Sequence, residues 1–278
     1  MALLLCCGRL GVQSYTHIVE PSFEIAPEAL PGLESDMARL LSGEPLQYVL
    51  GTAEFCGRSF RVAPGVLIPR PETEEMVGIA SGWLREASAA GRSALSDLNP
   101  NLLGAKGGLP AAKGPRILDL CTGSGCIAWT LALDFPGAEV VGVDLSDDAL
   151  SIAVSQPFQP SAPTFVKADV LGAVPQWEPF DLIISNPPYI MEAEKAAMRP
   201  NVLDWEPSMA LFVPDDDPLV FYRAVARWAG RLLRGMGLVE VNETLGPETA
   251  AVFRDAGFRD VSLLDDIFGK PRFVRFFS

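Results

Sequence analysis

The fold is decided by residues 116–125, which read Arg-Ile-Leu-Asp-Leu-Cys-Thr-Gly-Ser-Gly. The first five form a short apolar run of the kind found in buried strands. The glycines that follow permit a tight turn and let the backbone come close to a ligand. A helical pattern then continues to Leu133. The segment therefore predicts a strand, a turn and a helix, with a nucleotide-like cofactor at the turn, although such turns also occur in proteins that bind nothing.

The sequence after this turn alternates between strand and helix patterns. Such alternation predicts an α/β fold, with a mainly parallel sheet and helices on both of its faces. We expect strands at residues 139–144, 164–167, 181–185, 238–241, 261–264 and 272–277, and helices at residues 147–154, 218–233 and 248–256.

The sequence before the turn divides into shorter units. Apolar residues from Leu33 to Leu41 have helical spacing, and the pattern stops at Ser42-Gly43. Residues 54–62 predict a hairpin with Gly57 near its turn, and residues 72–84 predict a helix with glutamates in its first turn. We therefore expect a small N-terminal helical domain at 1–50, a hairpin and inter-domain segment at 51–86, a linker or insertion at 87–115, and the cofactor-binding domain at 116–278.

The overall composition narrows the class of partner. The chain has 278 residues, of which 49% are hydrophobic and 21% charged, which is typical of a soluble globular protein. Its net charge of −13 weighs against duplex DNA as the main partner, because DNA-binding proteins usually carry a basic surface. A basic protein partner fits this charge better.

Cysteine and histidine usage excludes several kinds of site. The five cysteines are an odd number outside any small disulfide framework, which indicates reduced thiols and a cytoplasmic protein. His17 is the only histidine, and Cys121 and Cys126 lack CxxC spacing. We therefore expect no metal and no hydrolase triad. Because there is no long uncharged apolar run, we also expect no membrane span.

The glycine spacing indicates which cofactor the turn accepts. A dinucleotide fingerprint needs glycine where the chain has Ala128, and the Lys-Ser/Thr pair of a phosphate-binding loop is absent. The remaining pattern, D-x-x-x-G-x-G from Asp119 to Gly125, resembles the first motif of class I methyltransferases. Cys121 replaces that family's usual glycine, and we expect so small a side chain to preserve the turn. Asp144 ends the next strand, where a carboxylate can accept both hydroxyls of a ribose.

A second motif, Asn186-Pro187-Pro188-Tyr189, follows the strand at 181–185. An amide nitrogen is a poor nucleophile, because its lone pair is delocalised into the carbonyl group. If Asn186 Oδ1 and the Pro187 carbonyl accept its two N–H groups, the charge that develops on the nitrogen is stabilised. Tyr189 can stack on the planar group and orient it. The motif predicts methylation of a planar amide or amine nitrogen. The alternative is that these residues form a proline-rich turn with a structural role only.

Four further segments make the resemblance specific. They are residues 44–51, which begin Glu-Pro-Leu-Gln-Tyr, residues 55–57, which read Phe-Cys-Gly, residues 66–74, which read Val-Leu-Ile-Pro-Arg-Pro-Glu-Thr-Glu, and residues 268–274, which read Phe-Gly-Lys-Pro-Arg-Phe-Val. Together with residues 186–189 they resemble the peptide chain release factor glutamine methyltransferases over residues 44–278, apart from the linker. The resemblance implies a class I seven-stranded sheet with a small helical N-terminal domain that helps to hold the substrate.

The resemblance also implies an activity and its residues. A methyl group would pass from S-adenosylmethionine to the side-chain nitrogen of the glutamine in the Gly-Gly-Gln motif of a class 1 release factor. The implied catalytic residues are Asn186, Pro187 and Tyr189. The implied cofactor residues are Asp119, Cys121, Thr122, Gly123, Ser124, Gly125, Asp144, Leu145, Asp169, Val170 and Asn186. The implied substrate-binding residues are Asn186, Pro187, Pro188, Tyr189, Arg70 and Glu72.

Three alternatives stay open at this point. A ribosomal-protein glutamine methyltransferase shares Asn-Pro-Pro-Tyr, but the stretch from Arg70 to Thr73 favours the release factor type. An adenine-N6 DNA methyltransferase uses a related motif and would need a target-recognition region and a basic face, neither of which the acidic chain offers. A non-catalytic cofactor-binding module would have no need of Asn186 and Tyr189.

Overall fold

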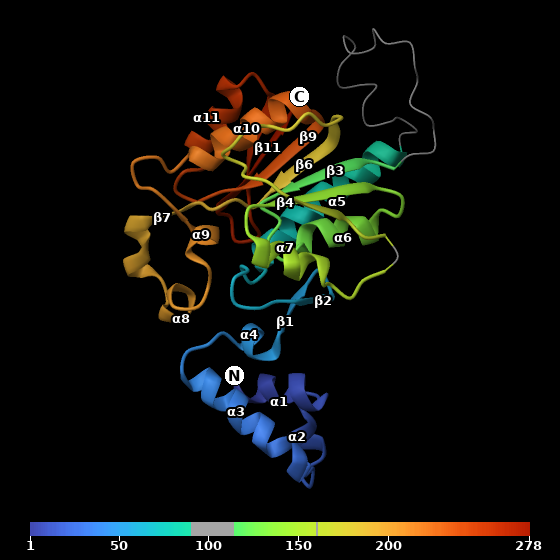
Figure 1. The fold of residues 1–278 in the computed structure, drawn as a ribbon, viewed down its shortest axis with the longest axis vertical. Coiled ribbons are helices and arrows are strands. Elements are labelled where there is room, and N and C mark those ends of the chain that lie inside the picture. Colours follow the sequence, from blue (N-terminus) through green and yellow to red (C-terminus); the bar gives the residue numbers. More distant parts are fainter. Residues whose placement is uncertain (90–113, 160) are drawn as a thin grey trace.

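The computed structural model describes residues 1–89, 114–159 and 161–278, and most of the predicted linker at 87–115 lies outside them (Figure 1). A seven-stranded sheet forms the centre of the molecule and confirms the predicted α/β methyltransferase fold. Its strand order is β10-β11-β9-β6-β3-β4-β5. The strands are β3 (Arg116–Leu120), β4 (Glu139–Asp144), β5 (Thr164–Lys167), β6 (Phe180–Ser185), β9 (Leu233–Glu240), β10 (Arg259–Asp265) and β11 (Pro271–Phe277).

The register of the central strands brings the two sequence motifs together. Parallel pairing places Leu120 of β3 opposite Val143 of β4 and Ser185 of β6. The turn after β3, Asp144 and Asn186 therefore emerge at one carboxyl edge, where α/β sheets bind ligands. β11 runs antiparallel to both of its neighbours and is the exception in an otherwise parallel sheet.

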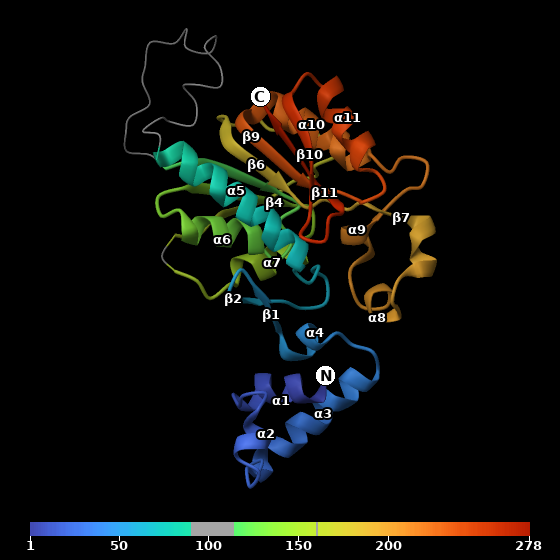
Figure 2. The same ribbon diagram turned by 180° about the vertical axis from the view of Figure 1, so that it is seen from behind.

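Helices cover both faces of the sheet, as Figures 1 and 2 show from opposite sides. Successive side chains of a strand point to opposite faces, so Ile117 and Leu118 enter different cores. Ile117 packs in the core beneath α5 and α6, whereas Leu118 packs beneath α10 and α11. The helices are α5 (Pro71–Ala89), α6 (Cys126–Asp134), α7 (Asp147–Val154), α10 (Val220–Leu232) and α11 (Gly246–Asp255).

The N-terminal helices lie at one end of the molecule, beyond the hairpin (Figure 1). The predicted helical segment at 33–41 belongs to α3, and Arg9 of α1 donates to Asp36 of α3 at 2.6 Å. The helical pattern of α1 was not identified from the sequence. The elements are α1 (Ala2–Leu10), α2 (Thr16–Val19), η1 (Pro27–Ala29), α3 (Leu30–Leu41) and α4 (Leu46–Leu50).

The predicted hairpin is confirmed as β1 (Thr52–Phe55) and β2 (Arg58–Arg61). Its two turn residues, Cys56 and Gly57, have φ angles of 49° and 70°. A two-residue turn with positive φ at both positions matches the twist of the strands. Phe55 and Phe60 are fully buried in the core that α5 and α6 share, so the hairpin is anchored on the sheet domain.

Two segments differ from the sequence prediction. The expected strand at 238–241 is too short, because β9 begins at Leu233, inside the expected helix at 218–233. Gly235 and Gly237 weaken the strand pattern, yet packing requires them: a Cβ would lie 2.2 Å from the Asp181 carbonyl oxygen at Gly235 and 2.1 Å from the Phe276 ring at Gly237.

Residues 190–213 were assigned no structure from the sequence, and they form a short-element insertion between β6 and α10. The helices of this insertion have four to six residues and make two turns or fewer, and its strands of two residues cannot show alternation, so neither has a periodicity that the sequence would reveal. They lie beside the carboxyl edge of the sheet in both views (Figures 1 and 2). They are β7 (Ile190–Met191), η3 (Glu192–Ala197), α8 (Pro200–Leu203), α9 (Ser208–Leu211) and β8 (Phe212–Val213). Among the helices of the described residues, none is long and apolar enough to cross a membrane.

Candidate active site

The glycine-rich turn joins β3 to α6 and adopts left-handed backbone conformations. Cys121, Gly123 and Gly125 have φ angles of 61°, 54° and 77°. Gly125 precedes α6, and a Cβ there would lie 2.9 Å from the Phe165 ring. Both its positive φ angle and this close contact therefore favour glycine at position 125. A cysteine in this conformation costs about 1–2 kcal/mol. The expected turn forms nevertheless.

Asp144, at the end of β4, faces this turn. Its Oδ2 accepts a hydrogen bond from Gly123 N at 2.9 Å, and its Oδ1 accepts one from Ser146 N at 3.0 Å. Each carboxylate oxygen has two acceptor sites, so each retains capacity for a further donor. The carboxylate is thus fixed in orientation while still able to receive two hydroxyl groups.

Asp119, predicted as a cofactor residue, lies beneath the turn and does not line the cavity beside it. It is fully buried, and its Oδ2 accepts hydrogen bonds from Thr122 Oγ1 at 2.5 Å and from Ala128 N at 3.2 Å. Burial raises the pKa of this carboxyl to about 7, while the two hydrogen bonds oppose the rise. Asp119 therefore ties the turn to the first turn of α6.

The raised pKa of Asp119 makes stability depend on pH. A carboxyl whose pKa rises on folding binds more protons in the folded state, so stability falls as pH climbs from the unfolded pKa of about 3.9 toward the folded value. The Asp119→Asn variant lacks this titration. We expect the melting temperature of the variant, relative to wild type, to increase between about pH 5 and about pH 8. A difference that stays constant or shrinks in thermal unfolding experiments would contradict this assignment.

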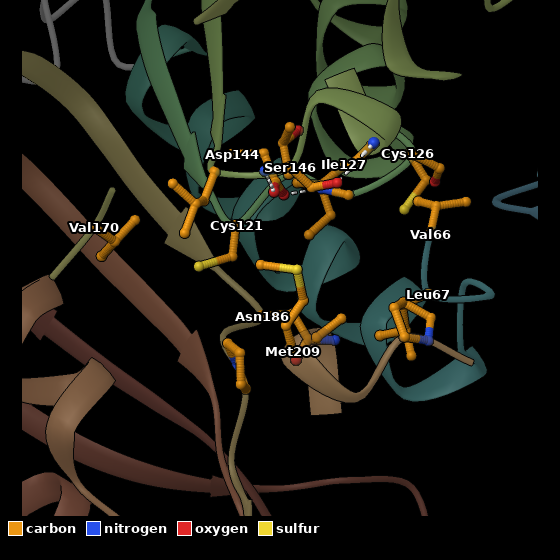
Figure 3. A pocket seen from close by; sticks show the side chains of 18 of the residues that line it. Val66, Leu67, Cys121, Cys126, Ile127, Asp144, Ser146, Val170, Asn186 and Met209 are labelled. Carbon is orange, nitrogen blue, oxygen red and sulfur yellow. Dashed lines mark hydrogen bonds between the residues drawn. The ribbon is translucent and has the colours of Figure 1, made fainter. Parts of the chain in front are cut away.

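A cavity of about 190 Å³ opens between the turn, the end of β4 and the residues after β6. Figure 3 shows Cys121, Asp144, Val170 and Asn186 around it. Its lining is mainly apolar, with Asp144, Asp169 and Asn186 among its polar residues. The predicted cofactor residues that line it are Cys121, Thr122, Gly123, Ser124, Asp144, Leu145, Asp169, Val170 and Asn186, whereas Asp119 and Gly125 do not.

The cavity also has lining residues that the sequence did not indicate. Phe221, in the first turn of α10, is the aromatic residue among the described lining residues. Met209 of α9, whose side chain Figure 3 shows beside Asn186, is 56% exposed and also lines the cavity. Neither residue belongs to a motif. Each lies on a helix that is distant in sequence from the glycine-rich turn and that contacts the cavity only in the folded chain.

A second cavity, of about 300 Å³, lies beside the first. Asn186, Arg70, Leu67 and Ala210 line both, so the two cavities are neighbours. Of the predicted substrate-binding residues, Asn186, Pro187, Tyr189 and Arg70 line the second cavity. Pro188 lines the first, and Glu72 lines neither.

Hydrogen bonds connect Asn186 and Tyr189 through a buried carboxylate. Asn186 Nδ2 donates to Thr73 Oγ1 at 3.0 Å, and Thr73 Oγ1 donates to Glu240 Oε2 at 2.7 Å. The Tyr189 hydroxyl donates to the other oxygen, Glu240 Oε1, at 2.9 Å. Glu240 ends β9 and is 1% exposed. Burial raises the pKa of both Glu240 and Tyr189.

Glu240 was missed by the sequence prediction, because it lies within the expected strand at 238–241 and belongs to no motif. Thr73 was quoted within the Arg-Pro-Glu-Thr stretch but given no role. Glu240 lies on β9, whereas its partners Thr73 and Tyr189 come from α5 and from the residues after β6, so only the assembled sheet places the three side chains together.

The border between the cavities is fixed by an ion pair. Arg70 Nη2 donates to Glu206 Oε1 at 2.5 Å, and Ile68 N donates to Glu206 Oε2 at 3.1 Å. Glu206 is buried, in the insertion between β6 and α10. The pair therefore holds the segment before α5 against that insertion. Within the described residues, no group of three or more histidine, cysteine, aspartate or glutamate side chains is arranged to hold a metal ion.

Comparison with known proteins identifies the family. A family model described as methyltransferase small domain matches residues 105–202. A release factor glutamine methyltransferase from Bacteroides thetaiotaomicron is 41% identical over 278 residues, which cover 99% of this chain and 90% of that protein. A protein of the same name from Chlorobaculum tepidum is 36% identical, covering 95% of this chain and 85% of its own length.

A solved structure from Alicyclobacillus acidocaldarius, described as a release factor-specific protein-(glutamine-N5) methyltransferase, is 27% identical. The match covers 78% of this chain and 98% of that one, with a TM-score of 0.43. The sequence identities over nearly the full length of the curated relatives agree with the two motifs at the carboxyl edge of the sheet. The chain belongs to the release factor glutamine methyltransferase family.

Proposed function

We propose that this protein transfers a methyl group from S-adenosylmethionine to the side-chain amide nitrogen (N5) of the glutamine in the Gly-Gly-Gln motif of a class 1 peptide chain release factor. The observation that carries the proposal is the orientation of Asn186 between the two cavities. Its Nδ2 is committed to Thr73, and within the described residues no hydrogen bond uses its Oδ1 as acceptor. An unused amide oxygen suits a substrate that brings N–H groups.

The residues of the first cavity fit S-adenosylmethionine. The Asp144 carboxylate can accept ribose hydroxyls, because each of its oxygens has just one partner among the described residues. Leu145, Val170 and Phe221 supply apolar surface suited to a base. When bound, the cofactor supplies a methyl group on a positively charged sulfur.

The second cavity fits the glutamine side chain. Asn186 Oδ1 and the Pro187 carbonyl oxygen accept the two amide N–H groups, which stabilises the positive charge that develops on the nitrogen as it is methylated. Tyr189 presents its ring to the planar amide, and its hydrogen bond to Glu240 fixes the ring position. The surplus proton leaves to water, so no strong base is required.

The net charge of −13 supports a protein substrate over duplex DNA. A substrate that acts in translation termination places the enzyme in the cytoplasm.

The test is methyl transfer from radiolabelled S-adenosylmethionine to a purified class 1 release factor, with its Gly-Gly-Gln Gln→Ala variant in parallel. We expect label on the first protein and none on the second. Equal labelling of both would move the target to another residue. Labelling of neither, while the cofactor still binds, would overturn the proposal and make ribosomal proteins the next candidates.

A further inference from the structure

The buried carboxylate of Glu240 imposes a direction on the hydrogen bonds that lead to Asn186. An ionised carboxylate can only accept, so Thr73 must use its single hydroxyl hydrogen on Glu240 Oε2. The Thr73 oxygen then has only lone pairs to offer Asn186. Its partner must be the Nδ2 group, at 3.0 Å, and not Oδ1. The amide of Asn186 is thereby held with its oxygen available to the substrate.

We propose that Glu240 is a positioning residue for methyl transfer, which sets the orientation of the Asn186 amide through Thr73 and holds the Tyr189 ring through its hydroxyl. The inference rests on the proposed function, since it assigns the acceptor role to Asn186 Oδ1. Glu240 does not line either cavity, so it acts through Thr73, Asn186 and Tyr189, which do.

The surroundings of Glu240 explain why a carboxylate is needed at this position. The hydroxyls of Thr73 and Tyr189 both point their hydrogens at it, and the backbone oxygen of Glu240 accepts a bond from the Tyr222 hydroxyl of α10 at 3.3 Å. A neutral amide here would replace one of the two acceptor oxygens by an NH2 group, which would face the hydroxyl oxygen of Thr73 or of Tyr189. It could reverse the Thr73 hydroxyl, which would then donate to Asn186 and turn the Asn186 amide around.

The direction of these bonds also depends on the protonation state of Glu240. The ionisable groups that face it are Glu72 on α5, Tyr189 after β6, Tyr222 on α10 and Arg272 on β11. Burial and Glu72 raise the pKa of Glu240, whereas Thr73, Tyr189 and Arg272 oppose the rise. A protonated Glu240 can donate, so the arrangement is lost as pH falls. Wild-type kcat is therefore expected to rise with pH as Glu240 ionises.

The test compares Glu240→Gln and Thr73→Val with wild type. For both variants we expect kcat toward the release factor to fall about tenfold, with the dissociation constant for S-adenosylmethionine within about twofold of wild type. Glu240→Gln is also expected to lose the acid limb of the kcat profile. Thr73→Ser, which keeps the hydroxyl, is expected to retain several times the kcat of Thr73→Val.

The matched control is Thr249→Val on α11. Thr249 is fully buried and its hydroxyl has no partner within the described residues, so this variant repeats the chemical change away from the site. Unchanged kcat in Glu240→Gln and Thr73→Val, or a loss confined to the KM for the release factor, overturns the inference. If Glu240→Gln fails to bind the cofactor, the comparison of kcat between Thr73→Val and Thr73→Ser tests the inference instead. Failure of wild type to label the release factor overturns the proposed function instead.

Discussion

Replacement of Asn186 by alanine is expected to lower kcat by about 10²-fold or more, which corresponds to about 3 kcal/mol of transition-state stabilisation. The variant removes the Oδ1 acceptor at the junction of the two cavities and leaves Thr73 without its donor. The interaction strengthens as the amide nitrogen gains positive charge, so its loss acts mainly on the chemical step. The measurement is single-turnover labelling of the release factor at saturating cofactor.

Cofactor affinity serves as the control for Asn186→Ala. Asn186 is one of many residues that line the first cavity, so the dissociation constant for S-adenosylmethionine is expected to change by a few-fold at most. A variant that binds the cofactor normally and still turns over at the wild-type rate would falsify the acceptor role of Asn186. It would also revive the interpretation of residues 186–189 as a structural turn.

Replacement of Asp144 by alanine is expected to raise the dissociation constant for S-adenosylmethionine by about 10²-fold. Hydrogen bonds to a charged acceptor contribute about 1.5–3 kcal/mol each, and Asp144 can accept from two ribose hydroxyls. The variant also releases Gly123 N and Ser146 N, which loosens the turn that borders the cavity. Isothermal titration calorimetry measures the affinity directly.

Asp147→Ala provides a matched control for Asp144→Ala. Asp147 lies three residues further on, its side chain is 75% exposed, and it pairs with Lys167 at the surface. Asp147→Ala changes the net charge by the same amount as Asp144→Ala, but Asp147 does not line the cavity. We expect wild-type affinity in Asp147→Ala and intermediate affinity in Asp144→Asn, which keeps one acceptor oxygen. Equal affinity in Asp144→Ala and wild type would contradict the placement of the ribose.

Much of the sheet domain could be predicted from the sequence, because its signals are local. The bounds of β3, β4, β5 and α7 agree with the expected segments residue by residue. Buried parallel strands are continuous apolar runs, and the turns between them carry glycine, proline or a helix-capping residue such as Ser146. The order of strands then places both motifs at one edge of the sheet.

Other parts had no local signal. β9 was shortened in the prediction because Gly235 and Gly237 resemble loop residues, although close contacts with Asp181 and Phe276 are what exclude any side chain there. Asp119 was grouped with the cofactor residues because it belongs to their motif, yet its carboxylate is turned inward beneath the turn. In both cases the deciding neighbour comes from another element of the fold.

The fold class, the glycine turn with Asp144 and the Asn186–Tyr189 motif could therefore be predicted, since each depends on residues close together in the chain. The contacts that orient these side chains form only when the chain folds. Thr73 and Glu240 are 167 residues apart, and Arg70 and Glu206 are 136 apart. A hydrogen bond between such distant residues leaves no periodicity or spacing in the sequence, because its geometry exists only once the sheet has brought the two side chains to the same edge.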